Sequence, residues 1–175
     1  MIHFITGGER SGKSRYAQQL ALELSDKPMY IATSRIWDKD FEKRVRRHKV
    51  ERDERWTSVE EEKQLSKIDL WASTPSEKKK VAVIDCVTLW LTNFYIDTKY
   101  NVEESLKQAK EEFAKLTKTD CTLIIISNEI GMGVHAETET GRKFVELQGW
   151  MNQYIAVRAN KVILMISGIP VTIKG

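Results

Sequence analysis

The chain has 175 residues, of which 41% are hydrophobic and 30% are charged, and its formal net charge is +3. These values are typical of a globular protein that buries its own core, and they exclude a disordered chain. No apolar run approaches the roughly 20 residues that span a bilayer, so we expect no stable membrane insertion. A net charge this small gives no support to nucleic-acid binding, and we expect none.

The first residues, Met1–Thr6, enter a strand-like run without the basic segment that begins a signal peptide, so no leader is expected. Cys86 and Cys121 lie in or beside apolar runs and lack metal-ligand spacing. They are interpreted as buried thiols of a reducing compartment. We therefore expect a cytoplasmic protein.

Five apolar runs in chain order are predicted to form strands. They are continuously apolar rather than alternating, which is typical of parallel strands covered on both faces. The runs comprise residues 3–5, 29–31, 81–84, 123–126 and 162–166.

Three segments between these runs repeat apolar residues at helical spacing: Ala17–Leu24, Val102–Leu116 and Phe144–Tyr154. Alternation of strands and helices predicts a single α/β domain, residues 1–175, with a mostly parallel sheet flanked by helices. The tail, Ser167–Ile173, follows the last run through a Ser-Gly turn and predicts a C-terminal antiparallel hairpin.

The segment between the first strand and the first helix has the pattern of a phosphate-binding loop, with Gly7, Gly12, Lys13 and Ser14 at the required positions. Glycines let the backbone N–H groups point at phosphate oxygens, and the following helix adds its positive N-terminal end. Lys13 is predicted to reach the β- and γ-phosphates, and the Ser14 hydroxyl to bind Mg²⁺. The alternative is a chance glycine-rich turn, which the strand before and the helix after the loop disfavour.

A second part of this site is expected where the third apolar run ends, at Asp85. Enzymes with this loop use such an acid to hold the metal, although a simple turn or helix cap is the alternative. Active sites of open α/β sheets lie at the carboxyl ends of the strands. Thr33, Asp85, Asn128 and Glu129 all follow such ends and could face one crevice.

The residues from Lys43 to Arg55 include seven Lys and Arg residues together with His48. A helix is predicted over Asp38–Arg52, and its basic side is either a solvated face or a surface that receives polyphosphate. His48 shares a face with Phe41 and Val45, and this spacing alone favours a core or rim histidine. The alternative is a nucleophile, because neutral imidazole can form a phosphoramidate with a phosphoryl or nucleotidyl group.

Taken together, these segments resemble the bifunctional adenosylcobinamide kinase/adenosylcobinamide-phosphate guanylyltransferase family over essentially the whole chain. The matching segments are Thr6–Arg15, Tyr30–Ser34, Arg44–His48 with Arg52, Trp56 and Glu60, Asp85–Asn93, Ser127–Gly133, Asn152–Gln153 and Ser167–Pro170. A phosphate-binding loop alone is widely shared, whereas these segments in this order are not.

The resemblance implies a RecA-like P-loop fold, a homotrimer and two reactions with the substrates GTP, ATP and adenosylcobinamide. First, a hydroxyl of adenosylcobinamide attacks the γ-phosphate of ATP or GTP. Then His48 attacks the α-phosphate of GTP, and the held GMP passes to the new phosphate to give adenosylcobinamide-GDP. By this resemblance His48 is the guanylylated residue, which reverses the interpretation from its spacing.

The resemblance also implies a set of site residues. Lys13 and His48 are expected to be catalytic, and Ser14 and Asp85 to hold Mg²⁺. The residues expected to bind nucleotide are Gly7, Gly8, Glu9, Arg10, Ser11, Gly12, Lys13, Ser14, Thr33, Ser34, Arg35, Lys49, Val50, Glu51, Arg52, Glu60 and Asp85.

Two alternatives remain open at the level of sequence. One is a small-molecule P-loop kinase that never guanylylates itself, and the other is a RecA-type ATPase whose basic helix contacts nucleic acid. The general base of the kinase step is also open, since Asp85 and Glu129 are both candidates by position.

Overall fold

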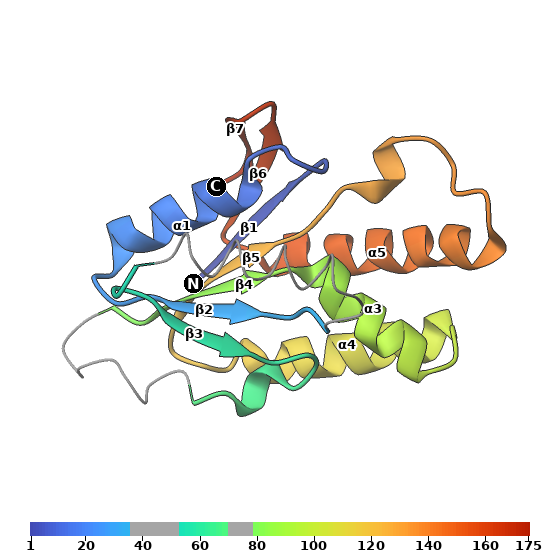
Figure 1. Cartoon of the computed structure of the whole chain (residues 1–175), viewed down its shortest axis with the longest axis horizontal. Coiled ribbons are helices and arrows are strands. Elements are labelled where there is room, and N and C mark those ends of the chain that lie inside the picture. Colours follow the sequence, from blue (N-terminus) through green and yellow to red (C-terminus); the bar gives the residue numbers. More distant parts are fainter. Residues whose placement is uncertain (36–52, 70–78) are drawn as a thin grey trace.

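The computed structural model describes residues 1–35, 53–69 and 79–175 (Figure 1). The predicted helix Asp38–Arg52, which carries His48, lies outside the described residues. Within them, no helix combines the length and the apolar character needed to cross a bilayer.

The centre of the structure is a seven-stranded sheet with the strand order β3-β2-β4-β5-β1-β6-β7. Its strands are β1 (Ile2–Gly7), β2 (Met29–Ala32), β3 (Thr57–Glu60), β4 (Val81–Asp85), β5 (Thr122–Ile126), β6 (Lys161–Ile166) and β7 (Ile169–Lys174). All neighbours pair in parallel except β6 and β7, which form an antiparallel hairpin. The predicted parallel sheet and closing hairpin are therefore confirmed.

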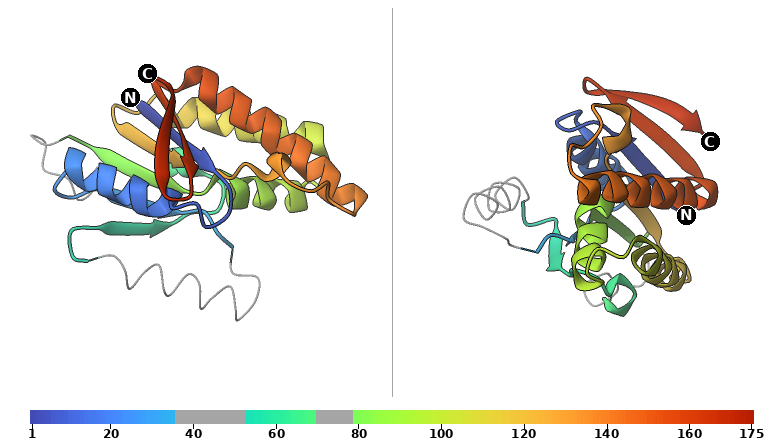
Figure 2. Two further views of the ribbon diagram at one scale, coloured as in Figure 1. Left: turned by 90° about the horizontal axis from the view of Figure 1, so that it is seen from above. Right: turned by 90° about the vertical axis from the view of Figure 1, so that its right-hand side faces the viewer.

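Helices cover both faces of this sheet (Figure 2). The helix α1 (Lys13–Leu24) packs on one face, and α3 (Val87–Asp97), α4 (Val102–Leu116) and α5 (Glu139–Arg158) pack on the other. Two short 3₁₀ turns, η1 (Leu65–Lys67) and η2 (Ile130–Met132), complete the elements. The strands alternate between the two cores, with Phe4 in the α3–α5 core and Ile5 in the α1 core.

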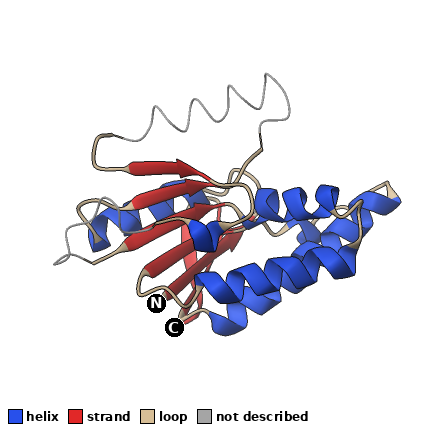
Figure 3. Ribbon diagram, turned by 90° about the horizontal axis from the view of Figure 1, so that it is seen from below, coloured by secondary structure: helices blue, strands red, loops and turns tan. Residues whose placement is uncertain are grey.

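The strand β5 lies between β1 and β4, so one strand separates the loop-bearing strand from the strand that ends in Asp85. This order agrees with the RecA-like arrangement that the resemblance implies. The parallel strands all end at the same edge of the sheet, where their arrowheads meet in Figure 3. That edge brings together residues that are far apart in the sequence.

Two elements were not predicted from the sequence. The strand β3 has only four residues and lies in an acidic stretch, with exposed residues alternating with half-buried ones. The helix α3 buries Val87, Trp90 and Phe94 on one side. Leu89 and Ile96 add apolar residues to the opposite side, so the helix lacks the polar face that marks an amphipathic helix in a sequence. Neither element could be predicted from local sequence, because the burial of its residues depends on neighbours that are distant in the chain.

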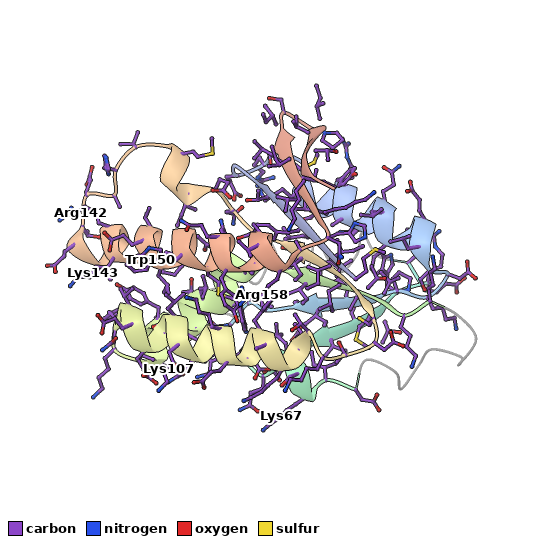
Figure 4. All side chains as sticks on the ribbon, turned by 180° about the vertical axis from the view of Figure 1, so that it is seen from behind. Lys67, Lys107, Arg142, Lys143, Trp150 and Arg158 are labelled. Carbon is purple, nitrogen blue, oxygen red and sulfur yellow. The ribbon has the colours of Figure 1, made fainter. Side chains whose placement is uncertain are left out.

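The outer face of the molecule carries α4 and α5 side by side (Figure 4). A hollow of about 540 Å³ lies between them, lined by aromatic and basic side chains that include Lys110, Trp150, Tyr154 and Arg158. It lies away from the carboxyl edge of the sheet and contains none of the predicted site residues.

Candidate functional site

The loop between β1 and α1 has a backbone that glycine is needed to form. Gly7 has φ 151°, and a Cβ atom there would lie 2.5 Å from the Met165 carbonyl oxygen. Gly12 has φ 93°, and its Cβ would lie 3.3 Å from Gly168. The loop is fixed to the hairpin by the Gly168 N–H, which donates to the Ser11 carbonyl at 3.0 Å. These features fit the predicted phosphate-binding loop.

Lys13 is the first residue of α1, and its side chain is curled into the loop. Nζ donates to the Gly8 carbonyl oxygen and, at 3.4 Å, to Ser11 Oγ. Burial lowers the Lys13 pKa, and Glu9, Cys86 and Asp85 oppose that shift. A partly desolvated ammonium group gains more from an anionic ligand than a hydrated one does. The position therefore suits the predicted contact with phosphates.

Ser14 and Asp85 are brought together across the sequence. Ser14 Oγ donates to Asp85 Oδ2 at 2.8 Å, joining the start of α1 to the end of β4. Hydroxyl and carboxylate oxygens are the ligands that Mg²⁺ prefers, with the remaining positions filled by water and substrate phosphates. No group of three or more His, Cys, Asp or Glu side chains that could enclose a metal is found in residues 1–35, 53–69 and 79–175. The pair could hold a metal that is shared with a phosphate.

Tyr30 is a further member of this group that sequence reasoning missed. Its hydroxyl donates to the same oxygen, Asp85 Oδ2, at 2.6 Å, although Tyr30 lies in the middle of β2 and is only 3% exposed. Its ring packs edge-on against Trp56, with 6.0 Å between the ring centroids. The available signal was a tyrosine in an otherwise apolar run, because a buried tyrosine hydroxyl usually has a partner.

A second carboxylate, Glu129, lies on the other side of the loop. Its backbone N–H donates to the Gly7 carbonyl at 3.1 Å. Its Oε1 accepts hydrogen bonds from Thr6 Oγ1 at 2.6 Å and Asn152 Nδ2 at 3.1 Å. Thr6 and Asn152 are buried, and neither was assigned a role from the sequence.

The amide of Asn152 is itself held by buried neighbours directly after β5 and on α5. Its Oδ1 accepts from Ser127 Oγ at 2.6 Å and from Gln148 Nε2 at 2.9 Å. Gln148 Nε2 also donates to Ser127 Oγ at 2.8 Å. A connected set of this kind restricts the rotamers of its members, so the Glu129 carboxylate is held in one orientation.

Thr33 follows β2 but does not present its hydroxyl to a crevice. The residue is fully buried, and its Oγ1 donates to the Cys86 carbonyl and accepts from the Cys86 N–H, both at 2.8 Å. Asn93 of α3 donates to the Thr33 carbonyl at 2.8 Å. The geometry gives Thr33 a role in fixing the end of β2 beside β4, and its predicted nucleotide contact stays a prediction.

Arg35 lies two residues further and joins three segments. It forms ion pairs with Glu62 at 2.6 Å and with Asp97 at 3.0 Å, and Lys63 also reaches Asp97 at 2.7 Å. Hydrogen bonds from Arg35 and then Lys63 hold the Asp97 pKa at about 2. The predicted contact of Arg35 with nucleotide would use a guanidinium that already has carboxylate partners.

The remaining predicted residues are placed as follows. Glu60 is exposed at the end of β3, in register with Ala32, and Ser34 is half-buried. Gly8, Glu9 and Arg10 are exposed at the tip of the loop, where Arg10 has φ 58°. His48, Lys49, Val50, Glu51 and Arg52 lie outside the described residues.

The interpretation of the two cysteines can be checked directly. Cys86 and Cys121 are free and buried, as predicted, and burial raises their pKa values to about 12 and about 11. Such thiols are inert at neutral pH. His135, in the loop between η2 and α5, is exposed.

Known proteins resemble this chain from end to end. The family described as cobinamide kinase / cobinamide phosphate guanyltransferase matches residues 3–173. Bifunctional adenosylcobalamin biosynthesis protein CobP of Pseudomonas aeruginosa is 34% identical over 176 residues, covering 100% of this chain and 98% of its own. The protein CobU of Escherichia coli is 34% identical over 185 residues, covering 99% of this chain and 100% of its own.

Among solved structures, the RadB recombinase is similar with a TM-score of 0.49 and 16% identity, covering 93% of this chain and 73% of that one. These values are too low to support an inference about function. The family match and the full-length relatives decide the identity: this chain belongs to the cobinamide kinase / cobinamide phosphate guanyltransferase family.

Proposed function

We propose that this chain phosphorylates adenosylcobinamide with ATP or GTP and then transfers GMP from GTP to the product, giving adenosylcobinamide-GDP. The observation that carries the proposal is the contact between Ser14 and Asp85 beside a glycine-requiring loop, in a chain that the family matches over residues 3–173. Both reactions begin with a triphosphate, which is the ligand that this loop suits.

Different residues of the chain bind the phosphates of the triphosphate and hold its metal ion. The loop N–H groups and Lys13 bind the β- and γ-phosphates and neutralise charge that develops on them. Ser14 and Asp85 would hold Mg²⁺, which supplies further neutralisation and fixes the phosphate geometry. The oxygen types of this pair and their 2.8 Å separation support that assignment.

For the second reaction we assign His48 as the nucleophile. Its imidazole would attack the α-phosphorus of GTP, form a phosphoramidate bond and expel pyrophosphate. The phosphate of adenosylcobinamide phosphate would then attack the same phosphorus and release the histidine. The basic residues around His48, including Arg44, Arg47 and Lys49, would screen the charge of the attacked triphosphate.

We further propose a cytoplasmic homotrimer. Its location is supported by two free, buried cysteines. Its assembly is supported by exposed apolar side chains on the hairpin strand β7, where Ile169 is 65% and Ile173 is 61% exposed. Exposed apolar residues that cluster on one strand are typical of contact surfaces between subunits.

The decisive experiment is labelling with GTP that carries a radioactive α-phosphate. After a quench, wild type should carry label that is lost in acid and retained in alkali, as expected of a phosphoramidate. His48→Asn should carry none and should still phosphorylate adenosylcobinamide. The matched control, His135→Asn, removes an exposed loop histidine and should label fully. Lys13→Ala should lose both reactions.

The outcomes separate the candidate functions. Full labelling of His48→Asn would remove His48 as nucleophile. An active kinase that is never labelled would be a monofunctional P-loop kinase. Triphosphate hydrolysis without transfer to adenosylcobinamide would favour a RecA-type ATPase. None of the described residues indicates that function in particular.

A further inference from the structure

The residue Glu129 occupies a distinctive place in the sheet. It follows β5 by three residues, and β5 lies between the loop-bearing strand β1 and the Asp85-bearing strand β4. Its backbone N–H donates to the carbonyl of Gly7, the first glycine of the loop, at 3.1 Å. The chain therefore positions Glu129 directly beside the loop that would hold the transferable phosphate.

The Glu129 carboxylate is oriented from one side only. Thr6 Oγ1 and Asn152 Nδ2 both donate to Oε1, at 2.6 and 3.1 Å. No hydrogen bond reaches Oε2 from any residue in the described parts of the chain. The side chain is half-buried, whereas both of its partners are buried. One oxygen thus anchors the carboxylate, and the other has no donor among the described residues.

The hydrogen-bond partners of Glu129 are neutral. They are a hydroxyl and an amide, and the next neighbours, Ser127 and Gln148, are also uncharged. Among the described residues, no Lys or Arg forms an ion pair with Glu129.

Asp85, the other candidate base, lies in a different setting. Its Oδ2 is hydrogen-bonded to Ser14, the predicted metal ligand, and to Tyr30. The two carboxylates therefore suit different tasks.

We propose that Glu129 is the general base of the kinase step, an inference that rests on the proposed function. Oε2 would take the proton of the adenosylcobinamide hydroxyl as that oxygen forms its bond to the γ-phosphorus. The bond from the γ-phosphorus to the β,γ-bridging oxygen breaks, and the nucleoside diphosphate leaves with the bonding electrons. The proton then passes from Glu129 to solvent or to the departing products.

The test variant is Glu129→Gln. The glutamine carbonyl can still accept from Thr6 and Asn152, so the anchoring contacts are retained while the base is lost. We expect kcat for adenosylcobinamide phosphorylation to fall by about 10²–10⁴-fold. The KM for ATP, self-labelling by GTP and Tm should stay near wild-type values. The matched control is Glu111→Gln, an exposed glutamate on α4, which should leave all four quantities unchanged.

A purely structural role predicts a different pattern. If Glu129 only holds β1 and α5 together, Glu129→Gln would lower Tm and impair labelling and phosphorylation alike, and the proposal would fail. Wild-type kcat in Glu129→Gln would also overturn it. Glu129→Asp, which keeps a carboxylate, should recover part of the lost kcat; activity no higher than that of Glu129→Gln would count against a base.

Failure of the proposed function would look different from failure of this inference. In that case wild type itself would not phosphorylate adenosylcobinamide. An active wild type with an equally active Glu129→Gln would remove only the base.

Discussion

Two carboxylates flank the phosphate-binding loop, and the chain builds both in the same way. On the α1 face, Asp85 Oδ2 accepts from Ser14 and Tyr30, at 2.8 and 2.6 Å. On the α5 face, Glu129 Oε1 accepts from Thr6 and Asn152, at 2.6 and 3.1 Å. In each case two donors from different elements converge on one oxygen of a side chain at the carboxyl end of the sheet.

The two groups differ in the identity of one donor. Ser14 belongs to the loop itself, so Asp85 is coupled to the residue expected to touch the metal. Thr6 and Asn152 belong to a strand and a helix, so Glu129 is coupled only to the scaffold. We infer that the Asp85 group serves every reaction that begins with a bound triphosphate, whereas the Glu129 group serves only the transfer to a hydroxyl.

Of the variants that compare the two groups, the broadest effect should come from Asp85→Asn, which should impair both reactions. Because the substitution removes the negative charge next to Ser14, both phosphorylation and self-labelling should fall, each by about 10²–10³-fold. Raising the Mg²⁺ concentration should restore part of each activity. Parallel assays with labelled ATP and labelled GTP would measure this. If Asp85→Asn lost phosphorylation and kept self-labelling, Asp85 would act only in the kinase step, as Glu129 is proposed to do. The two groups would then not differ in role.

A smaller effect is expected when each carboxylate loses one donor. Tyr30→Phe removes the hydroxyl that positions Asp85, and it should lower both reactions by about 10-fold, a common cost of removing an outer partner of a metal ligand. Thr6→Val removes the corresponding donor to Glu129 while keeping the size of the side chain, and it should lower only the kinase kcat.

The measurement for this pair is the ratio of kinase to labelling rates. The ratio should stay near its wild-type value in Tyr30→Phe and fall in Thr6→Val. Equal ratios in the two variants would show that the two sides of the loop are not functionally separate. A Tm measured for each variant would identify a loss that comes from unfolding.

How much of this arrangement was predictable depends on how local each feature is. The loop and α1 were predictable because Gly7, Gly12, Lys13 and Ser14 act within one short segment. The parallel strands were predictable from their apolar runs. Asp85 was predictable because it ends such a run, and topology alone then brings it to the loop.

The partners of the two carboxylates could not be predicted in the same way. Tyr30 lies 55 residues from Asp85, and Thr6 lies 123 residues from Glu129. Each looks like an ordinary strand residue, and its role follows from the strand order and from the side of the strand on which it lies. The strand β3 was missed for a related reason, since its pairing with β2 is visible only in the folded chain.

A third carboxylate, Asp97, belongs to neither group and can be compared with both. It ends α3, where the helix dipole disfavours a negative charge, and it is paired with Arg35 and Lys63. Hydrogen bonds from Arg35 and Lys63 lower the pKa of Asp97 from 3.8 to about 2. A lowered pKa in the folded state means that the ionised form stabilises the fold. That contribution is present above pH 3.8 and is lost as the pH falls towards 2.

Asp97→Asn should therefore have the smallest effect, and on stability rather than chemistry. The side chain is 35% exposed, so solvent screening limits the expected loss in the free energy of unfolding at pH 7 to below about 1 kcal/mol. Urea unfolding at several pH values would measure it, with Asp120→Asn, an exposed aspartate, as the control. The difference from wild type should shrink between pH 4 and pH 2 and in about 1 M salt, which screens exposed charges.

A difference that is constant across this range would mean that Asp97 acts through packing. A loss of labelling or phosphorylation at pH 7 would mean that the ion pairs of Arg35 position the nucleotide site. Asp97 would then act in nucleotide binding, as Asp85 is proposed to do, and not only in stability.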